Sequence, residues 1–244
     1  MHHATVVHGD RAARSLEPDH FVERHARQVA VVDRTDPGTI AAVKIEELAL
    51  VASRDHPHRP HRVVDVGCGS LRAGRLLIPY LRPGHYCGLD PNRWLIEEGI
   101  KRELGRDLVR IKRPRFAYAD DFSLSAFRTP FDYAMAHSIF SHAYADFTGQ
   151  GLKEIAKGLS ESGLLLATYI DGDATTQGSG WLYPGCVTYT WDDMLGLISN
   201  SGLVARRLDW MHPRQAWFAA ARPGDEQRLT DLADRLRQPL ADKK

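Results

Sequence analysis

Short apolar runs alternate with amphipathic stretches through the middle of the chain. The runs are rich in Val, Leu, Ile, Phe and Ala, and the stretches between them carry apolar residues at helical spacing. Strands are expected at 63–66, 86–89, 115–119, 131–136 and 163–170, and helices at 75–81, 92–104 and 145–159, with Gly105 as the helix stop. This alternation predicts an α/β fold around a parallel sheet.

The two ends of the chain carry weaker patterns. Helices are expected before the first strand, over 19–32 and 39–51, and the proline-broken histidine run at 56–61 predicts a linker rather than a metal site. Beyond the middle, the pattern predicts a helix at 191–200, an antiparallel strand pair at 203–210 and 215–221, and a helix at 225–236. We therefore divide the chain into an N-terminal helical cap and linker (1–62), a main domain (63–221) and a C-terminal helix and tail (222–244).

A glycine-rich turn follows the first predicted strand. Asp65, Gly67 and Gly69 form Asp-x-Gly-x-Gly, which leads into the helix that begins near Arg75. Glycines let a ligand approach the backbone, and a helix N-terminus offers unpaired N–H groups. The turn therefore predicts a binding site.

Asp90 ends the second predicted strand and narrows the class of ligand. A carboxylate at this place accepts hydrogen bonds from ribose hydroxyls, in dinucleotide and adenosyl sites alike. The dinucleotide fingerprint requires a third glycine where this chain has Arg72. An adenosyl ligand is therefore favoured over a nicotinamide or flavin dinucleotide.

The series of motifs resembles the class I S-adenosylmethionine-dependent methyltransferases, in a bacterial branch acting on small molecules or saccharides. It includes the stretches 65–72, 88–92, 120–122 and 138–142, and covers about 63–221. The resemblance implies a Rossmann-like, seven-stranded, mostly parallel sheet with helices on both faces and an antiparallel C-terminal strand. It also implies that the N-terminal helices, with the 172–189 loop, form a lid, although the helices are equally consistent with simple packing on the sheet.

The resemblance also implies roles in cofactor binding. Asp65 would help to hold the methionine amino group and Asp90 the ribose, while either Asp120 or Asp121 would meet the adenine amino group. The full set of predicted cofactor-binding residues is Asp65, Gly67, Gly69, Arg72, Asp90, Asp120, Asp121, Phe122 and His137.

A general base is needed if the acceptor is a hydroxyl, because a hydroxyl is a poor nucleophile until its proton is removed. His137 and His142 flank the loop after the fourth strand, and histidine accepts protons near neutral pH. We favour His142 over His137, with Tyr144 orienting either one. A packing role for both histidines remains the alternative.

The long irregular segment 172–189 is predicted to line the acceptor site. It carries Trp181, Tyr183 and Tyr189, whose rings could stack on a sugar, while Asp171 and Asp173 could bond its hydroxyls. A flat natural product would also fit. Asp171, Asp173 and Asp121 could instead bind Mg²⁺, or simply cap turns.

Composition changes this picture little. The 32 basic and 31 acidic residues leave a formal net charge of +1, so no general field attracts nucleic acid or a membrane. Three unpaired cysteines and the lack of a long apolar segment predict a reduced, cytoplasmic protein without nucleic-acid or membrane partners. A homodimer is left open.

The sequence thus predicts a methyltransferase that modifies a hydroxyl of a sugar or oligosaccharide. Three alternatives are an N- or C-methyltransferase of a small metabolite or aromatic natural product, a dinucleotide-dependent oxidoreductase, and a catalytically silent adenosyl-binding regulatory protein. Arg72 counts against the oxidoreductase.

Overall fold

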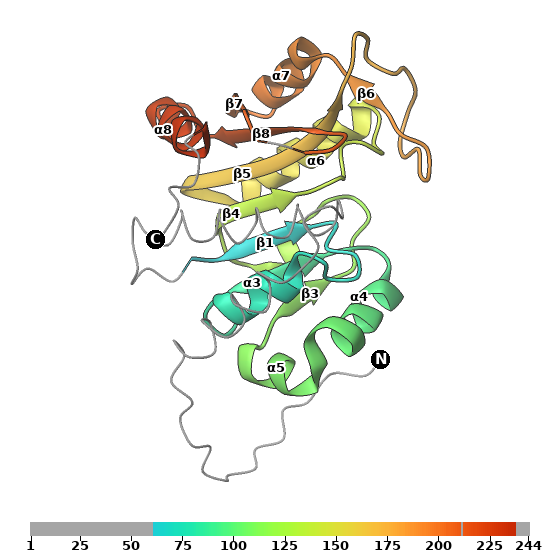
Figure 1. Cartoon of the computed structure of the whole chain (residues 1–244), viewed down its shortest axis with the longest axis vertical. Coiled ribbons are helices and arrows are strands. Elements are labelled where there is room, and N and C mark those ends of the chain that lie inside the picture. The colour runs from blue at the N-terminus through green and yellow to red at the C-terminus, as the bar shows by residue number, and fades with distance from the viewer. Residues whose placement is uncertain (1–60, 211, 238–244) are drawn as a thin grey trace, which may run out of the picture. The chain divides into compact units, whose positions relative to one another are not determined.

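A single mixed sheet forms the centre of the fold. The computed structural model describes residues 61–210 and 212–237, and the strands of the main path run in the order β3-β2-β1-β4-β5-β8-β7 (Figure 1). Their bounds are β1 (Val63–Val66), β2 (Tyr86–Leu89), β3 (Arg115–Ala117), β4 (Phe131–Ala136), β5 (Leu159–Asp171), β7 (Val204–Leu208) and β8 (Ala216–Ala221).

Strand direction confirms the predicted sheet. β1 pairs in parallel with β2 and β4, β2 with β3, and β4 with β5, whereas β8 is antiparallel to both β5 and β7. A further two-residue strand, β6 (Thr188–Tyr189), pairs in parallel with the end of β5 and was not predicted. The parallel strands therefore bring their carboxyl ends to one edge of the sheet, where ligands bind in open α/β folds.

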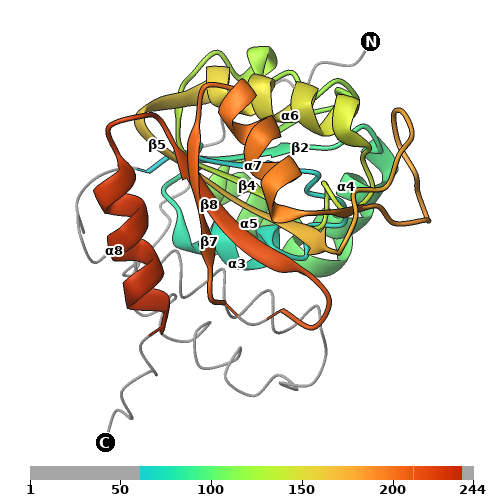
Figure 2. The same cartoon turned by 90° about the horizontal axis from the view of Figure 1, so that it is seen from above.

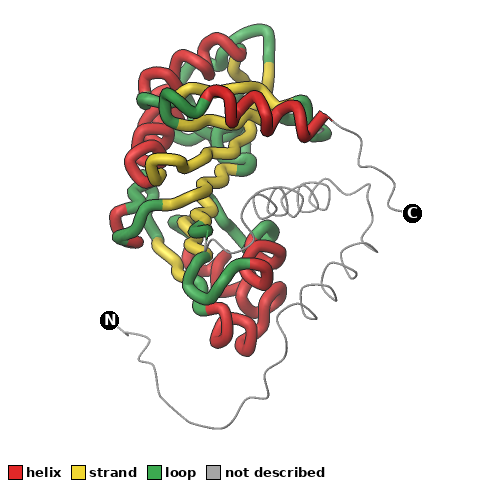
Figure 3. The backbone as a smooth tube through the Cα atoms, turned by 90° about the vertical axis from the view of Figure 1, so that its left-hand side faces the viewer, coloured by secondary structure: helices red, strands yellow, loops and turns green. Residues whose placement is uncertain are grey.

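Helices cover both faces of the sheet. α6 (Ala145–Gly158) and α7 (Trp191–Asn200) pack on one face, and their apolar side chains join Val64, Val66 and Phe218 in the largest core cluster (Figure 2). The other face carries α3 (Gly74–Tyr80), α4 (Arg93–Gly99), α5 (Gly105–Lys112) and α8 (Glu226–Arg237). Figure 3 shows the strands lying between these helices. Burial on both faces explains why the central strands are nearly continuous apolar runs.

The helix predicted over 92–104 has a more complex form. α4 passes into a π-helical turn, η1 (Ile100–Leu104), and α5 begins immediately afterwards at Gly105, whose φ is +75°. Gly105 does end the first helix, as predicted. The prediction missed α5, because a glycine with left-handed backbone was interpreted only as a stop and not as the joint between two helices.

Several predictions fall on residues that the structure does not describe. The helices at 19–32 and 39–51, the lid that they would form and the histidine linker all lie within 1–60. Across 61–210 and 212–237, no helix has the length and apolar character needed to span a bilayer.

Candidate functional site

A cavity of about 470 Å³ lies at the carboxyl ends of β1, β2 and β4. Its size suits a small-molecule ligand. It is lined by Val66, Gly67, Leu89, Asp90, Pro91, Asn92, Trp94, Leu95, Ala119, Asp120, Phe122, Ser138, Ile139, His142, Trp181 and Tyr183. Seven residues predicted for cofactor, base or acceptor contact are therefore brought together: Gly67, Asp90, Asp120, Phe122, His142, Trp181 and Tyr183.

The glycine turn after β1 exposes backbone to this cavity. Gly67 has φ of +71°, and a Cβ added there would lie 1.9 Å from Cδ1 of Ile139. Gly69 also has positive φ, +49°, and its nearest neighbour is Asp90 Oδ2, at 4.0 Å from the position of a Cβ. The turn therefore depends on glycine both for its backbone conformation and for the space that a side chain would fill.

Asp90 is fixed at the end of β2 by two backbone hydrogen bonds. Gly69 N–H donates to Oδ2 at 2.9 Å, and Asn92 N–H donates to Oδ1 at 2.8 Å. The side chain lines the cavity although the residue is only 7% exposed. A carboxylate held in this way keeps free lone pairs for further donors, such as a pair of ribose hydroxyls.

Asp65 lies behind the turn rather than on the cavity wall. It is 3% exposed, and Tyr86 donates its hydroxyl proton to Oδ2 at 2.7 Å. Burial raises the pKa of Asp65 to about 7, opposed by the Tyr86 hydrogen bond, while the nearby Asp90 raises it further. The carboxylate would therefore be stabilised by a cationic group arriving beside it.

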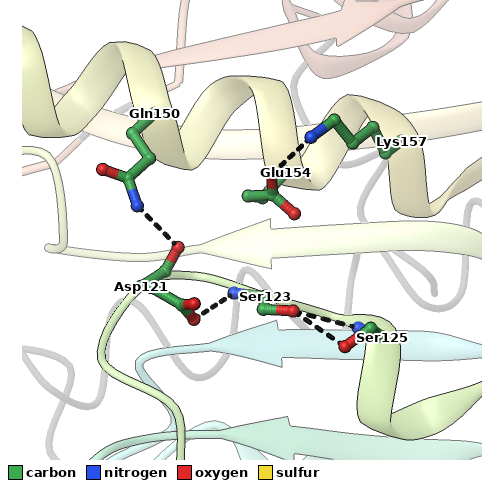
Figure 4. Close-up of polar contacts among 6 residues, drawn as sticks. All are labelled: Asp121, Ser123, Ser125, Gln150, Glu154 and Lys157. Atoms are coloured by element: carbon green, nitrogen blue, oxygen red, sulfur yellow. Dashed lines mark hydrogen bonds and ion pairs between the residues drawn. The ribbon is translucent and has the colours of Figure 1, made fainter.

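The turn after β3 distinguishes two neighbouring aspartates. Asp120 lines the cavity, whereas Asp121 accepts a hydrogen bond from Ser123 N–H and its carbonyl accepts one from Gln150 (Figure 4). Asp121 is therefore an Asx-turn residue, which corrects its assignment to the cofactor site. Phe122 is buried beside the cavity and packs 5.8 Å from the ring of Trp181.

His142 is the histidine that reaches the cavity. Its Nδ1 lies 2.7 Å from the carbonyl oxygen of Gly185, and its ring packs edge-on to Tyr183 at 5.2 Å. A carbonyl only accepts, so Nδ1 carries the proton and Nε2 of the neutral ring is left as the acceptor. This is the tautomer that a general base requires.

His137 is placed elsewhere. It is not among the residues that line the cavity, and its ring stacks on Trp217 at 5.4 Å. Burial lowers the pKa of His137 to about 4, with further contributions from His212 and Arg72. The structure therefore corrects the assignment of His137 to the cofactor site, and it separates His137 from His142.

Tyr144 and Arg72 also lie away from the cavity lining. The Tyr144 ring packs against Gly178, where an added Cβ would lie 2.3 Å from ring carbons, and Arg72 is exposed on the turn before α3. Neither position supports the predicted role, as orienter of a histidine or as cofactor ligand. Both residues lie close in sequence to the site, but neither is among the residues that line the cavity.

The 172–189 segment contributes two of its three aromatic residues. Trp181 and Tyr183 line the cavity and are 43% and 79% exposed. Tyr189 is 1% exposed and donates its hydroxyl to the carbonyl of Ala143, so its assignment to the acceptor site is wrong. It lies in β6, where alternate side chains point inward, and this places it in the core.

Backbone hydrogen bonds join this segment to the loop that carries His142. Leu182 N–H donates to the carbonyl of His142 at 2.7 Å, and Val187 N–H donates to that of Ser141 at 2.9 Å. Tyr144 N–H donates to the carbonyl of Gly180 at 2.9 Å. The aromatic residues and the histidine therefore belong to one connected unit.

Asp171 and Asp173 do not reach the cavity. Asp171 forms an ion pair with Arg207 at 2.7 Å and accepts a hydrogen bond from the hydroxyl of Tyr169. Asp173 is exposed. Within the part of the chain that the structure describes, no three His, Cys, Asp or Glu side chains gather as metal ligands. The structure therefore does not support the Mg²⁺ site that the sequence left open, and Asp121 and Asp171 are each held in a separate local contact.

The prediction missed several residues of the cavity wall. Trp94 and Leu95 come from the first turn of α4, and Ser138 and Ile139 from the loop after β4. Trp94 is 65% exposed, and it was interpreted as part of the apolar face of a helix. Its position directly after the Asp90 turn was the signal that could have identified it, since ligands bind at strand ends.

The chain matches a known protein family over its central part. Residues 64–165 match the model of a family described as a methyltransferase domain. This range begins in β1 and ends in β5, so it contains the glycine turn, Asp90, Asp120, Phe122 and His142. No curated protein matches the chain in sequence.

Solved structures share the fold at low sequence identity. An S-adenosylmethionine-dependent methyltransferase from Clostridium acetobutylicum is 13% identical with a TM-score of 0.57, over 84% of this chain and 98% of that one. Magnesium protoporphyrin IX methyltransferase from Synechocystis, with bound S-adenosylmethionine, is 12% identical with a TM-score of 0.58. The match covers 87% of this chain and 100% of that one. A glycopeptide N-methyltransferase complexed with the same cofactor is 13% identical with a TM-score of 0.55. The match covers 73% of this chain and 94% of that one.

Proposed function

We propose that this chain is a class I S-adenosylmethionine-dependent methyltransferase that methylates a hydroxyl of a sugar or oligosaccharide, with His142 as general base. The observation that carries the proposal is the setting of His142. Its Nδ1 donates to the Gly185 carbonyl, its Nε2 is left as acceptor, and Trp181 and Tyr183 line the same cavity.

The residues around the glycine turn fit the cofactor. Gly67 lines the cavity without a side chain, so a ligand can contact the backbone of the turn, and Asp90 retains lone pairs for the ribose hydroxyls. Asp120 and Phe122 would take the adenine, the former at its amino group and the latter beside the ring. The buried carboxyl of Asp65 is the group that would attract the amino group of the methionine part.

His142 would act on the acceptor hydroxyl. Bound S-adenosylmethionine supplies an electrophilic methyl group on a sulfonium. Nε2 of His142 would accept the proton of the acceptor hydroxyl, and the hydroxyl oxygen would take the methyl group that the cofactor supplies, with the thioether as leaving group. A positioned base of this kind contributes about 10²–10⁴-fold to the rate. The Gly185 carbonyl would hold the proton of the neutral ring on Nδ1, which leaves Nε2 free to accept before transfer.

The aromatic residues favour a saccharide as acceptor. Trp181 and Tyr183 offer exposed ring faces at the cavity, and the C–H face of a sugar packs on such rings while its hydroxyls remain available for hydrogen bonds. Placement against the rings would also align the acceptor, a contribution that reaches about 7–11 kcal/mol in ideal cases.

Labelled methyl transfer tests the proposal. The full chain is incubated with S-adenosylmethionine carrying a labelled methyl group, and with separate panels of methyl glycosides, phenols and primary amines. We expect label in the glycosides, because a hydroxyl is the acceptor that needs a positioned base. Label in the amines alone would overturn the hydroxyl acceptor and the role of His142.

A further inference from the structure

A cluster of polar and aromatic side chains lies next to the cavity, where β4 ends and β8 begins. We define this cluster as His137, His212, Gln215 and Trp217. The His137 ring stacks on Trp217 at 5.4 Å and lies 5.5 Å from the ring of His212, and Gln215 N–H donates to His212 Nδ1 at 2.9 Å. None of these four side chains takes part in the proposed cofactor or base contacts.

Three polar atoms of this cluster are buried without a hydrogen-bond partner among the described residues. They are Nε2 of His137, Oε1 of Gln215 and Nε1 of Trp217. An unpaired buried polar group costs about 1–3 kcal/mol, and nearly all such groups in folded proteins are paired. Three in one place therefore point to a ligand that carries both hydrogen-bond donors and acceptors.

Gln215 connects the cluster to the cavity. Its Nε2 donates to Oγ of Ser138 at 2.7 Å, and Ser138 lines the cavity. That bond fixes the orientation of the amide, which leaves Oε1 as an acceptor facing away from Ser138. Ser138 itself is held with φ of +62°, and its N–H donates to Oγ1 of Thr168 at 2.8 Å. The cluster is thus rigidly attached to the cavity wall.

The charges around the cluster select the class of ligand. His137 stays neutral near pH 7, because burial disfavours its charged form and the positive charge of Arg72 adds to that effect. An ammonium group would meet the same repulsion. Oε1 of Gln215 requires a donor, Nε1 of Trp217 requires an acceptor, and His137 Nε2 takes either role according to its tautomer. A neutral hydroxyl both donates and accepts.

We propose that His137, Gln215 and Trp217 form a subsite that binds hydroxyl groups of the acceptor, next to the hydroxyl that is methylated. This inference rests on the proposed function and adds to it a determinant of acceptor specificity. The Trp217 ring supports the imidazole of His137, and the two side chains together with Gln215 recognise a neighbouring hydroxyl pair of a saccharide.

The first test separates acceptor affinity from cofactor affinity. Gln215→Leu removes the acceptor oxygen, and we expect it to raise KM for methyl glycosides about tenfold, as the loss of one hydrogen bond does. The dissociation constant for S-adenosylmethionine should stay within twofold. Gln227→Leu is the matched control, because Gln227 is exposed on α8 and pairs with Asp231. It should change neither constant.

The second test does not depend on turnover. Trp217→Phe keeps the ring and removes only the N–H, so it identifies the Trp217 indole signal among those of the five tryptophans in a ¹⁵N NMR spectrum. Adding methyl glucoside, galactoside, mannoside or rhamnoside to the S-adenosylhomocysteine complex should shift that signal. Thermal unfolding of both variants shows whether they are folded.

The outcomes distinguish the subsite from the proposed function. If the wild-type protein methylates glycosides, but Gln215→Leu leaves their KM unchanged and the Trp217 signal does not move, the subsite is wrong and the function stands. If only amines are methylated, the function is wrong. The NMR experiment then decides only whether the three side chains bind a glycoside hydroxyl, since a shift supports that contact and an unmoved signal overturns it.

Discussion

The two halves of the cavity are built in different ways. The half around β1 and β2 is made of backbone and of carboxylates that already accept hydrogen bonds from the protein. Each oxygen of Asp90, for example, accepts one backbone N–H. The half around His142 and Trp181 is made of side chains from segments far apart in sequence, with exposed rings beside it. This difference indicates that the first half is organised for one fixed ligand, whereas the second offers contacts that only an acceptor would complete.

The largest expected effect comes from Asp65, the carboxyl behind the glycine turn. Burial raises its pKa strongly, so its charge state affects the stability of the cofactor half. Its pKa is 3.8 when unperturbed and about 7 in the folded chain. The protonated form is therefore favoured by folding, and stability falls as pH rises from about 4 to about 7. Each pKa unit corresponds to about 1.4 kcal/mol, so the loss amounts to a few kcal/mol.

Asp65→Asn removes this titration while Asn can still accept from Tyr86. Its unfolding free energy should be flatter with pH than that of the wild type and higher above pH 7. Urea unfolding at several pH values, without cofactor, measures both. Parallel profiles for the two proteins would show that Asp65 titrates normally.

His142→Ala is the next largest change and tests the acceptor half. We expect the turnover number to fall by at least about 10²-fold with little change in cofactor affinity, because a general base contributes in the transition state alone. Single-turnover kinetics and calorimetric cofactor binding on one preparation provide both values. His85→Ala, at a half-buried histidine that contacts the carbonyl of His61, serves as the control. A folded His142→Ala protein with near-normal turnover would remove the base from the proposal.

Asp90→Ala tests the cofactor half. It deletes the proposed ribose contact, and charge-assisted hydrogen bonds contribute about 1.5–3 kcal/mol, so cofactor affinity should fall tenfold or more. The acceptor KM, measured at saturating cofactor, should change far less. Equal losses of affinity for cofactor and acceptor would mean that the two halves do not work separately.

Gly67→Ala carries the smallest expected effect on stability. A non-glycine residue at φ of +71° costs about 1–2 kcal/mol, and its Cβ would displace the flexible end of Ile139. Gly196→Ala is the matched control, because Gly196 lies in α7 with open space around it and alanine favours a helix by about 0.5–1 kcal/mol. Thermal unfolding should therefore move in opposite directions for the two variants. A shift in the same direction would mean that the turn tolerates a side chain.

The sequence predicted the cofactor half better because its determinants are local. Gly67, Gly69 and Asp90 follow directly from strand ends, and the register of β1 with β2 brings them together. The choice between Asp120 and Asp121 required the structure of the turn. There Ser123 and Gln150 donate hydrogen bonds to Asp121, and this was not visible in the sequence. Neighbouring residues with the same chemistry cannot be separated by pattern alone.

The acceptor half depends on pairings that span distant parts of the chain, and these do not appear in periodicity. Tyr189 was placed at the cavity because β6 was missed, and a two-residue strand is too short to produce an alternating pattern. Gln215 lies far from Ser138 in sequence, so the bond between them carried no local signal. The sequence pointed to Trp181 and Tyr183 because aromatic residues in a long irregular segment indicate binding, and both residues line the cavity.

The hydrogen bonds between the 172–189 segment and the His142 loop separate the fold of this segment from the identity of two side chains that line the cavity. The bonds from Leu182, Val187 and Tyr144 join backbone to backbone and impose no choice of side chain. Replacement of Trp181 or Tyr183 therefore leaves these backbone bonds and the contact of His142 Nδ1 with the Gly185 carbonyl in place. The two positions are accordingly the natural starting points for directed evolution of the residues that line the cavity.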